Sequence, residues 1–156
     1  PRRSLRRGYS HPGSGSISFA GMTIDDAEWH LDSVLDRSLD RSAAAVHIGV
    51  FLAWASRRGL LDSRHSGVAT DLELRAGTPA QFAHQHFVAQ FATWDLTTEG
   101  QRFAQAGYRA YLSGMSGVPA LAEHEDSYLI PDSWDSYDAI APWLDQLYGE
   151  WRASIE

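Results

Sequence analysis

The stretch AAAVHIGVFLAW, residues 43–54, constrains the fold more than any other part of this 156-residue chain. Over residues 42–58, apolar side chains cover most of the helical circumference, with Val46 and Val50 on one side and Ile48 on the other. A helix that is apolar almost all round belongs inside a core, and this one is too short to cross a bilayer. The sequence therefore predicts a central packing helix over 42–58.

Start signals predict further helices around this one. Thr78 followed by Pro79 is a good helix start, because a threonine cap precedes proline at the first helical position. Thr23 and Asp26 resemble a capping box. A short helix or turn is therefore expected near 24–37, and helices are expected from Thr78, from Thr97 or Thr98, and over 133–151. Alternating strand patterns are few, so we predict a mostly α fold, a compact single-domain bundle of about five or six helices with at most a short β element.

The first 21 residues differ from the rest in composition. Residues 1–21 are rich in Arg, Ser, Gly and Pro, and they lack both a helical or strand period and the apolar run of a secretory signal. Met22 looks like a natural beginning. We interpret 1–21 as a flexible basic extension, either native or added upstream of the natural start, and 22–156 as a single α-helical domain with a cytoplasmic location.

Composition excludes several chemistries. The chain has no cysteine and no lysine, which excludes disulfides, thiolate metal sites, Schiff-base chemistry and a phosphate-loop lysine. From Met22 onward, nine arginines face twenty acids, a formal charge of 9 − 20 = −11. Such a domain repels phosphates, so we expect no nucleic-acid partner. The charge suits a basic protein partner, and solubility alone is the other interpretation.

The seven histidines raise the question of a metal site. His84 and His86 point to different faces if their segment is helical. Asp26 and His30 lie one helical turn apart and could both ligate a metal, although a cap carboxylate beside a half-buried imidazole is the alternative. From the sequence we assign no metal ligand, no cofactor and no catalytic residue.

His47 is a polar residue in the most apolar stretch. A buried imidazole needs a hydrogen-bond partner, because leaving it unsatisfied costs about 1–3 kcal/mol. We predict a neutral His47 bound to a backbone carbonyl, to a carboxylate such as Asp26, or to the region of His30. Small residues, Gly49 among them, let neighbouring elements approach closely. Structural roles are assigned to Trp29, His30, His47, Gly49 and Trp54.

The segment PDSWDSYD, residues 131–138, places aromatic side chains among carboxylates. Trp134, Asp135, Tyr137 and Asp138 fit an exposed recognition surface for an Arg- or Lys-rich protein, since aromatics are favoured anchors at interfaces. The alternative interpretation is a helix-capping cluster whose aromatic rings are tucked against the core.

Three stretches together resemble an uncharacterised bacterial domain family with a HIG-x-F-L-A-W helix. They are DDAEWH (25–30), AAAVHIGVFLAWASRRGL (43–60) and SWDSYDAIAPWLDQLYGEW (133–151). The family resembles small cytoplasmic proteins encoded near polymorphic toxins, which implies an immunity role and supplies no catalytic residues. The resemblance also implies that Trp29, His30 and His47 recur together, so that the two histidines lie near each other.

Three functions follow as hypotheses. The first is a non-enzymatic acidic protein-binding module, an immunity or antitoxin-like protein that masks a basic toxin. The second is a helical scaffold or homodimer, although the sequence does not indicate an oligomeric state. The third is a small metal-dependent or small-molecule enzyme in which His30 and His47 line a pocket between helices. No segment is long and apolar enough to suggest a membrane partner.

Overall fold

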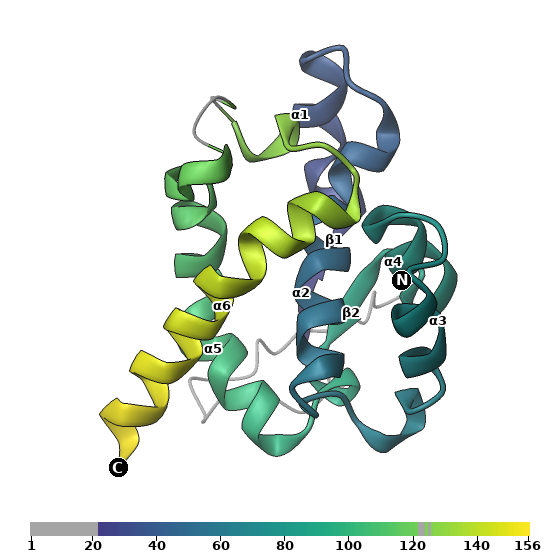
Figure 1. Ribbon diagram of the computed structural model, residues 1–156. Helices are drawn as coiled ribbons and strands as arrows, with labels where there is room; N and C mark the ends of the chain where they lie inside the picture. The colour runs from purple at the N-terminus through teal and green to yellow at the C-terminus, as the bar shows by residue number, and fades with distance from the viewer. Residues whose placement is uncertain (1–21, 122–123, 125) are drawn as a thin grey trace, which may run out of the picture.

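A computed structural model describes residues 22–121, 124 and 126–156, and the extension inferred over 1–21 lies outside these described residues (Figure 1). The described chain contains six α-helices and a two-stranded antiparallel sheet, β1 (Thr23–Asp26) with β2 (Gln90–Ala92). The helices are α1 (Leu31–Asp36), α2 (Val46–Arg57), α3 (Val68–Leu74), α4 (Pro79–Phe87), α5 (Thr98–Gly114) and α6 (Trp134–Ile155). The predicted single-domain, mostly α fold with a minor β element is confirmed.

Helix α2 is the central helix that the sequence predicts. All ten residues from Val46 to Ala55 are buried, and α4, α6 and α3 pack against the helix. A Cβ atom on Gly49 would lie 1.9 Å from the carbonyl oxygen of Pro79, so only glycine allows α2 and α4 to approach this closely. The helix begins at Val46 rather than 42, because a short 3-10 helix, η2 (Arg41–Ala44), precedes it.

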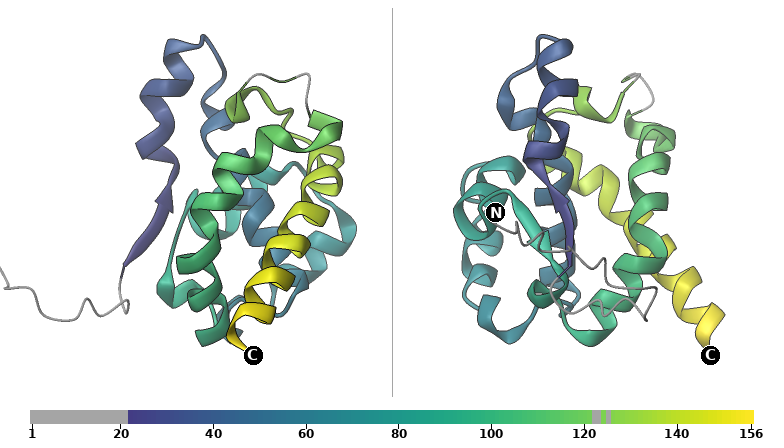
Figure 2. Two further views of the ribbon diagram at one scale, coloured as in Figure 1. Left: turned by 90° about the vertical axis from the view of Figure 1, so that its left-hand side faces the viewer. Right: turned by 180° about the vertical axis from the view of Figure 1, so that it is seen from behind.

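The start signals of the later helices are confirmed. Thr78 caps α4 in a capping box with Gln81, and Thr97 caps α5. Ser133 caps the long helix α6, which runs beside α5 over one side of α2 (Figures 1 and 2). These two helices contribute aromatic rings to the core around α2.

The short helix or turn predicted near 24–37 is confirmed from Ala27 to Asp36 and wrong for the residues before Ala27. Residues Thr23–Asp26 form β1, paired with β2 in the register Thr23↔Ala92 and Asp25↔Phe91, and a 3-10 helix, η1 (Ala27–His30), and α1 follow. Asp26 still acts as a cap, because its side chain accepts a hydrogen bond from the Glu28 amide at 2.9 Å. Since successive side chains of a strand point to opposite faces, Asp25 is buried and Asp26 is not.

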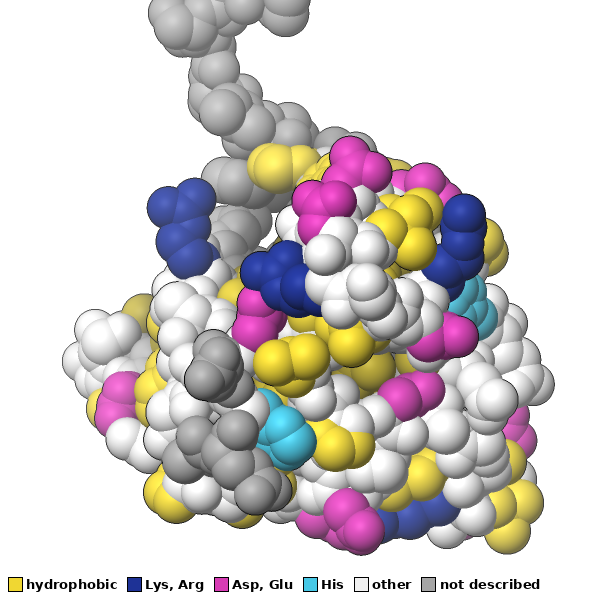
Figure 3. All heavy atoms as spheres, turned by 90° about the horizontal axis from the view of Figure 1, so that it is seen from above, with side chains coloured by type: hydrophobic (Ala, Val, Ile, Leu, Met, Phe, Trp, Pro, Cys, Tyr) yellow, Lys and Arg dark blue, Asp and Glu magenta, His cyan; other side chains and the backbone are white. Residues whose placement is uncertain are grey.

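The surface carries both charges. On the face that Figure 3 shows, basic and acidic side chains lie among one another, and ion pairs such as Arg37–Asp126 and Arg75–Asp138 join distant parts of the chain. None of the described helices is both long and apolar enough to pass through a membrane.

Candidate functional site

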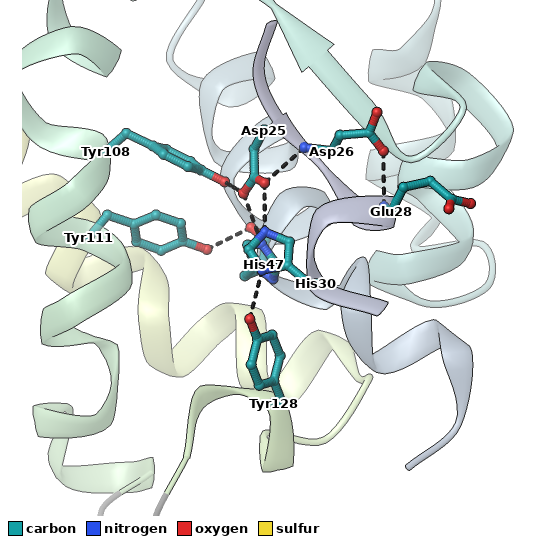
Figure 4. Close-up of polar contacts among 8 residues, drawn as sticks. All are labelled: Asp25, Asp26, Glu28, His30, His47, Tyr108, Tyr111 and Tyr128. Atoms are coloured by element: carbon teal, nitrogen blue, oxygen red, sulfur yellow. Dashed lines mark hydrogen bonds and ion pairs between the residues drawn. The ribbon is translucent and has the colours of Figure 1, made fainter. Parts of the chain in front are cut away.

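The buried carboxylate of Asp25 lies at the centre of a polar cluster (Figure 4). One oxygen, Oδ1, is 2.6 Å from Nε2 of His30 and accepts the Asp26 amide at 2.8 Å. The other, Oδ2, is 2.9 Å from Nε2 of His47 and accepts the Tyr108 hydroxyl at 2.5 Å. Because an ionised carboxylate only accepts, both Nε2 atoms donate, and all four lone-pair positions of Asp25 are filled.

The two histidines come from different elements and meet edge to face. His30 ends η1 and His47 lies in the first turn of α2, and their ring centroids are 4.5 Å apart at 83°. The other ring nitrogen of His30, Nδ1, is hydrogen-bonded to the Tyr128 hydroxyl at 2.6 Å. Tyr111 donates to the backbone carbonyl of His47 at 2.7 Å. We call Asp25, His30, His47, Tyr108, Tyr111 and Tyr128 the Asp25 cluster.

The cluster holds the negative charge of Asp25 beside the buried side chains of His47 and Tyr108. Burial alone would raise the pKa of Asp25, but hydrogen bonds from His30 and His47 outweigh it and hold this pKa well below its usual range. Burial lowers the pKa of His47, against the opposing effect of Asp25. Burial also raises the pKa of Tyr108, and the charge of Asp25 adds to this shift. Asp25 is therefore ionised while its buried neighbours stay neutral donors.

A cavity of about 530 Å³ opens beside the cluster, between β1, η1 and α5. It reaches the cluster at Asp25, His30 and Tyr108. The rest of its lining is mostly apolar and consists of Met22, Thr23, Ile24, Trp29, Thr93, Ala104, Gln105, Arg109 and Leu112. Arg109 is exposed and makes no ion pair with any residue that the structure describes.

The structure refines the sequence predictions for the histidines. His47 does bind a carboxylate, but the partner is Asp25 and not Asp26, because Asp26 faces outward from β1. His30 and His47 lie together, as the family resemblance implied. Asp25, His30 and His47 each offer one potential metal-ligand atom, and these atoms lie within 4.8 Å of one another. His84 and His86 do not join them; His86 instead contacts Asp71 at 2.8 Å.

Trp29 and Trp54, both assigned structural roles, have different surroundings. Trp54 is buried in the core, and its Nε1 donates to Asp145 at 2.8 Å. Trp29 is 62% exposed and lines the cavity beside the Asp25 cluster. The structural role assigned to Trp29 stays a prediction.

The segment 131–138 is arranged as a helix cap. Tyr137 is buried, so the exposed position is wrong for this ring and the alternative of a ring tucked against the core holds. Trp134 is half-buried and donates to the carbonyl of Gly77 at 2.9 Å. Asp138 pairs with Arg75, while Asp135 is exposed. The partner-binding role of these residues stays a prediction, with less accessible aromatic surface than the sequence suggested.

Sequence reasoning missed most of the cluster. Tyr108 and Tyr111 read as ordinary packing residues of a helix, and no local pattern assigns a use to their hydroxyl groups. Asp25 was not identified, because the residues TIDD fit both the pattern of a helix cap and that of a short strand. The available signal was the need of a buried His47 for a polar partner, which predicted the kind of contact but not the residue.

Comparison with known proteins identifies a family without a known activity. A family model described as a domain of unknown function, DUF7832, matches residues 23–129, a range that contains every residue of the Asp25 cluster. No curated protein and no solved structure matches the chain. The model covers more than half of the chain, and the chain belongs to the DUF7832 family.

Proposed function

We propose that this chain binds a small organic anion with an apolar body in the cavity beside the Asp25 cluster. The observation that carries the proposal is the cavity itself, whose volume of about 530 Å³ lies in the range of small-molecule sites. Its walls come from β1, η1 and α5, and the Asp25 cluster ties these elements to one another and to α2. The cluster therefore keeps the cavity wall in place before a ligand arrives.

The lining favours an organic anion over an organic cation. Arg109 is the one arginine of the described lining, and it is exposed at the edge of the cavity. Asp25 carries a charge, but its four acceptor positions are filled by hydrogen bonds from within the protein. A ligand carboxylate or sulfonate would pair with Arg109 while its apolar part packs against Trp29 and Leu112.

Titration with anilinonaphthalene sulfonate, an apolar anion that fluoresces in apolar sites, tests this proposal. Arg109→Gln should weaken its binding by about 10- to 150-fold, because a charge-assisted hydrogen bond contributes about 1.5–3 kcal/mol. Arg102→Gln is the matched control, since Arg102 is another exposed arginine of α5 and does not line this cavity. Equal binding by wild type and Arg109→Gln would contradict the proposal.

The acid surplus supports a second candidate, a basic protein partner. The formal charge of −11 over 22–156 and the resemblance to toxin-associated immunity proteins both favour it, and a bacterial, cytoplasmic setting belongs to the same candidate. Affinity capture from the native host is the test. A basic protein retained at low salt and released at high salt is expected; capture of no basic protein would contradict this candidate.

A further inference from the structure

We propose that Asp25, His30 and His47 bind one divalent transition-metal ion of the Zn²⁺ type, with a coordination position left open toward the cavity. These residues form the one group in the described part of the chain whose histidine and carboxylate ligand atoms converge, within 4.8 Å. Three protein ligands with an open position are typical of reactive rather than purely structural zinc sites. The proposal stands whether or not an organic anion occupies the cavity.

The ligand atoms already face a common point. Both imidazoles present Nε2 to the same carboxylate, His30 at 2.6 Å from Oδ1 and His47 at 2.9 Å from Oδ2. Ligands bound to Zn²⁺ at about 2.0–2.1 Å stand roughly 3.3 Å apart in tetrahedral geometry. The rings therefore need to withdraw from the carboxylate by less than about 1 Å to admit the ion.

The proton arrangement allows this exchange. Ligation needs a free Nε2 lone pair, which a neutral imidazole supplies by moving its proton to Nδ1. In His30 the Nδ1 proton would then be donated to the Tyr128 oxygen, 2.6 Å away.

The groups behind the ligands are also in place. The Tyr108 hydroxyl and the Asp26 amide hold the Asp25 carboxylate, Tyr128 holds His30, and Tyr111 holds the backbone of His47. Metal sites need such supporting hydrogen bonds to fix the orientation and tautomer of their ligands. Asp25 and His30 line the cavity, which gives the ion and a further ligand a way in.

Two other histidines contact carboxylates without forming such a site. His65 contacts Asp95 and His86 contacts Asp71, each at 2.8 Å, but neither pair has a third converging ligand among the described residues. Two imidazoles and one carboxylate favour Zn²⁺, Co²⁺ or a similar ion over Mg²⁺ and Ca²⁺, which prefer oxygen ligands.

Titration of the untagged, chelator-treated full chain with Co²⁺, followed by its visible absorption and by displacement with Zn²⁺, tests the proposal. We expect one Co²⁺ per chain, displaced by Zn²⁺ and not by Mg²⁺. His30→Gln should weaken Co²⁺ binding by at least about 100-fold, since loss of a supporting residue alone costs 10–100-fold. His86→Gln is the matched control, because the two side chains have nearly equal exposure, 20% for His86 and 19% for His30, and both contact an aspartate.

Two outcomes would overturn the site: no stoichiometric binding of Co²⁺ or Zn²⁺ by the wild type, or unchanged binding by His30→Gln. Circular dichroism checks the fold of that variant. If it does not fold, Tyr128→Phe replaces it, with an expected loss of about 10–100-fold and unchanged binding as the contradicting result. Arg109→Gln should keep full Co²⁺ affinity, and anilinonaphthalene sulfonate should still bind the metal-free protein. A failure of the metal site can therefore be distinguished from a failure of the anion site.

Discussion

Two parts of this molecule use the same pair of residue types in different ways. Asp25 lies 2.6 and 2.9 Å from two imidazoles, and Asp71 lies 2.8 Å from His86. The Asp25 side chain is only 4% exposed, however, while that of Asp71 is 38% exposed. Asp25 joins β1, η1, α2 and α5, whereas Asp71 joins only α3 and α4. Burial of the carboxylate and the number of elements that it joins, rather than the contact distance, therefore decide how much a His–Asp contact contributes to stability.

The largest difference is expected on removing each carboxylate. Asp25→Ala should lower the free energy of unfolding by about 3–5 kcal/mol, because two imidazoles and the Tyr108 hydroxyl lose a buried charged acceptor. Asp71→Ala should lower it by no more than about 1 kcal/mol. Urea unfolding of both variants measures the difference. Equal losses would show that the two contacts are equivalent.

Removal of a single hydroxyl sharpens the same comparison. Tyr108→Phe deletes a donor to buried Asp25 and should cost about 1.5–3 kcal/mol of unfolding free energy. Tyr148→Phe deletes a donor to Glu99, at 3.0 Å, whose side chain is 39% exposed, and should cost less than about 1 kcal/mol. Thermal unfolding followed by circular dichroism is sufficient. A cost for Tyr108→Phe no larger than that for Tyr148→Phe would argue against a strongly bound carboxylate.

The pH dependence of stability reports on proton uptake by His47. Because the folded pKa of His47 lies below its unfolded value of about 6.5, the unfolded chain takes up the proton first as pH falls. His47 therefore lowers stability below about pH 6.5, with a slope of at most about 1.4 kcal/mol per pH unit. The contribution of Asp25, whose folded pKa is lowered, persists above about pH 3.9 and is lost as pH falls further.

Unfolding of the chelator-treated protein across this range, with His47→Gln as comparison, measures the His47 contribution. The variant should lack the part of the slope that the wild type shows just below pH 6.5. The same slope in both proteins would mean that His47 takes up its proton equally in the folded and unfolded states.

The smallest effect is expected at the edge of the cluster. Tyr128 is half-buried, and its hydroxyl is hydrogen-bonded to His30 Nδ1. Tyr128→Phe should lower the unfolding free energy by about 0.5–1.5 kcal/mol, less than Tyr108→Phe does. Chemical denaturation provides the measurement, and a larger loss than for Tyr108→Phe would reverse the inferred order of the two hydroxyl groups.

The sequence predicted those parts of the fold that local patterns determine. The apolar run around Val50 required a buried helix, and Thr78 with Pro79 marked the start of α4. Strand β1 was not predictable in this way, because its pairing with β2 connects segments far apart in the chain. Its four residues also satisfy the pattern of a helix cap, and the wrong choice moved the expected partner of His47 from Asp25 to Asp26.

The candidate site was predictable only in its chemistry. A histidine buried in an apolar helix has to find a polar partner, which correctly indicated a contact for His47. The cavity depends on how β1, η1 and α5 come together, and no local pattern reports that arrangement. Tyr137 shows the opposite error, because its acidic neighbours suggested exposure while the packing of α6 against the core buries the ring.

NMR of the histidine rings during titration with anilinonaphthalene sulfonate tests most directly whether the cavity beside the Asp25 cluster binds a small organic anion. His30→Gln and His86→Gln identify the two signals. If the cavity binds the probe, the chemical shifts of the His30 ring change with a saturating curve that matches the fluorescence titration, while those of His86 do not change. Binding of the probe with no change at His30, or with equal changes at His86, would contradict the proposal.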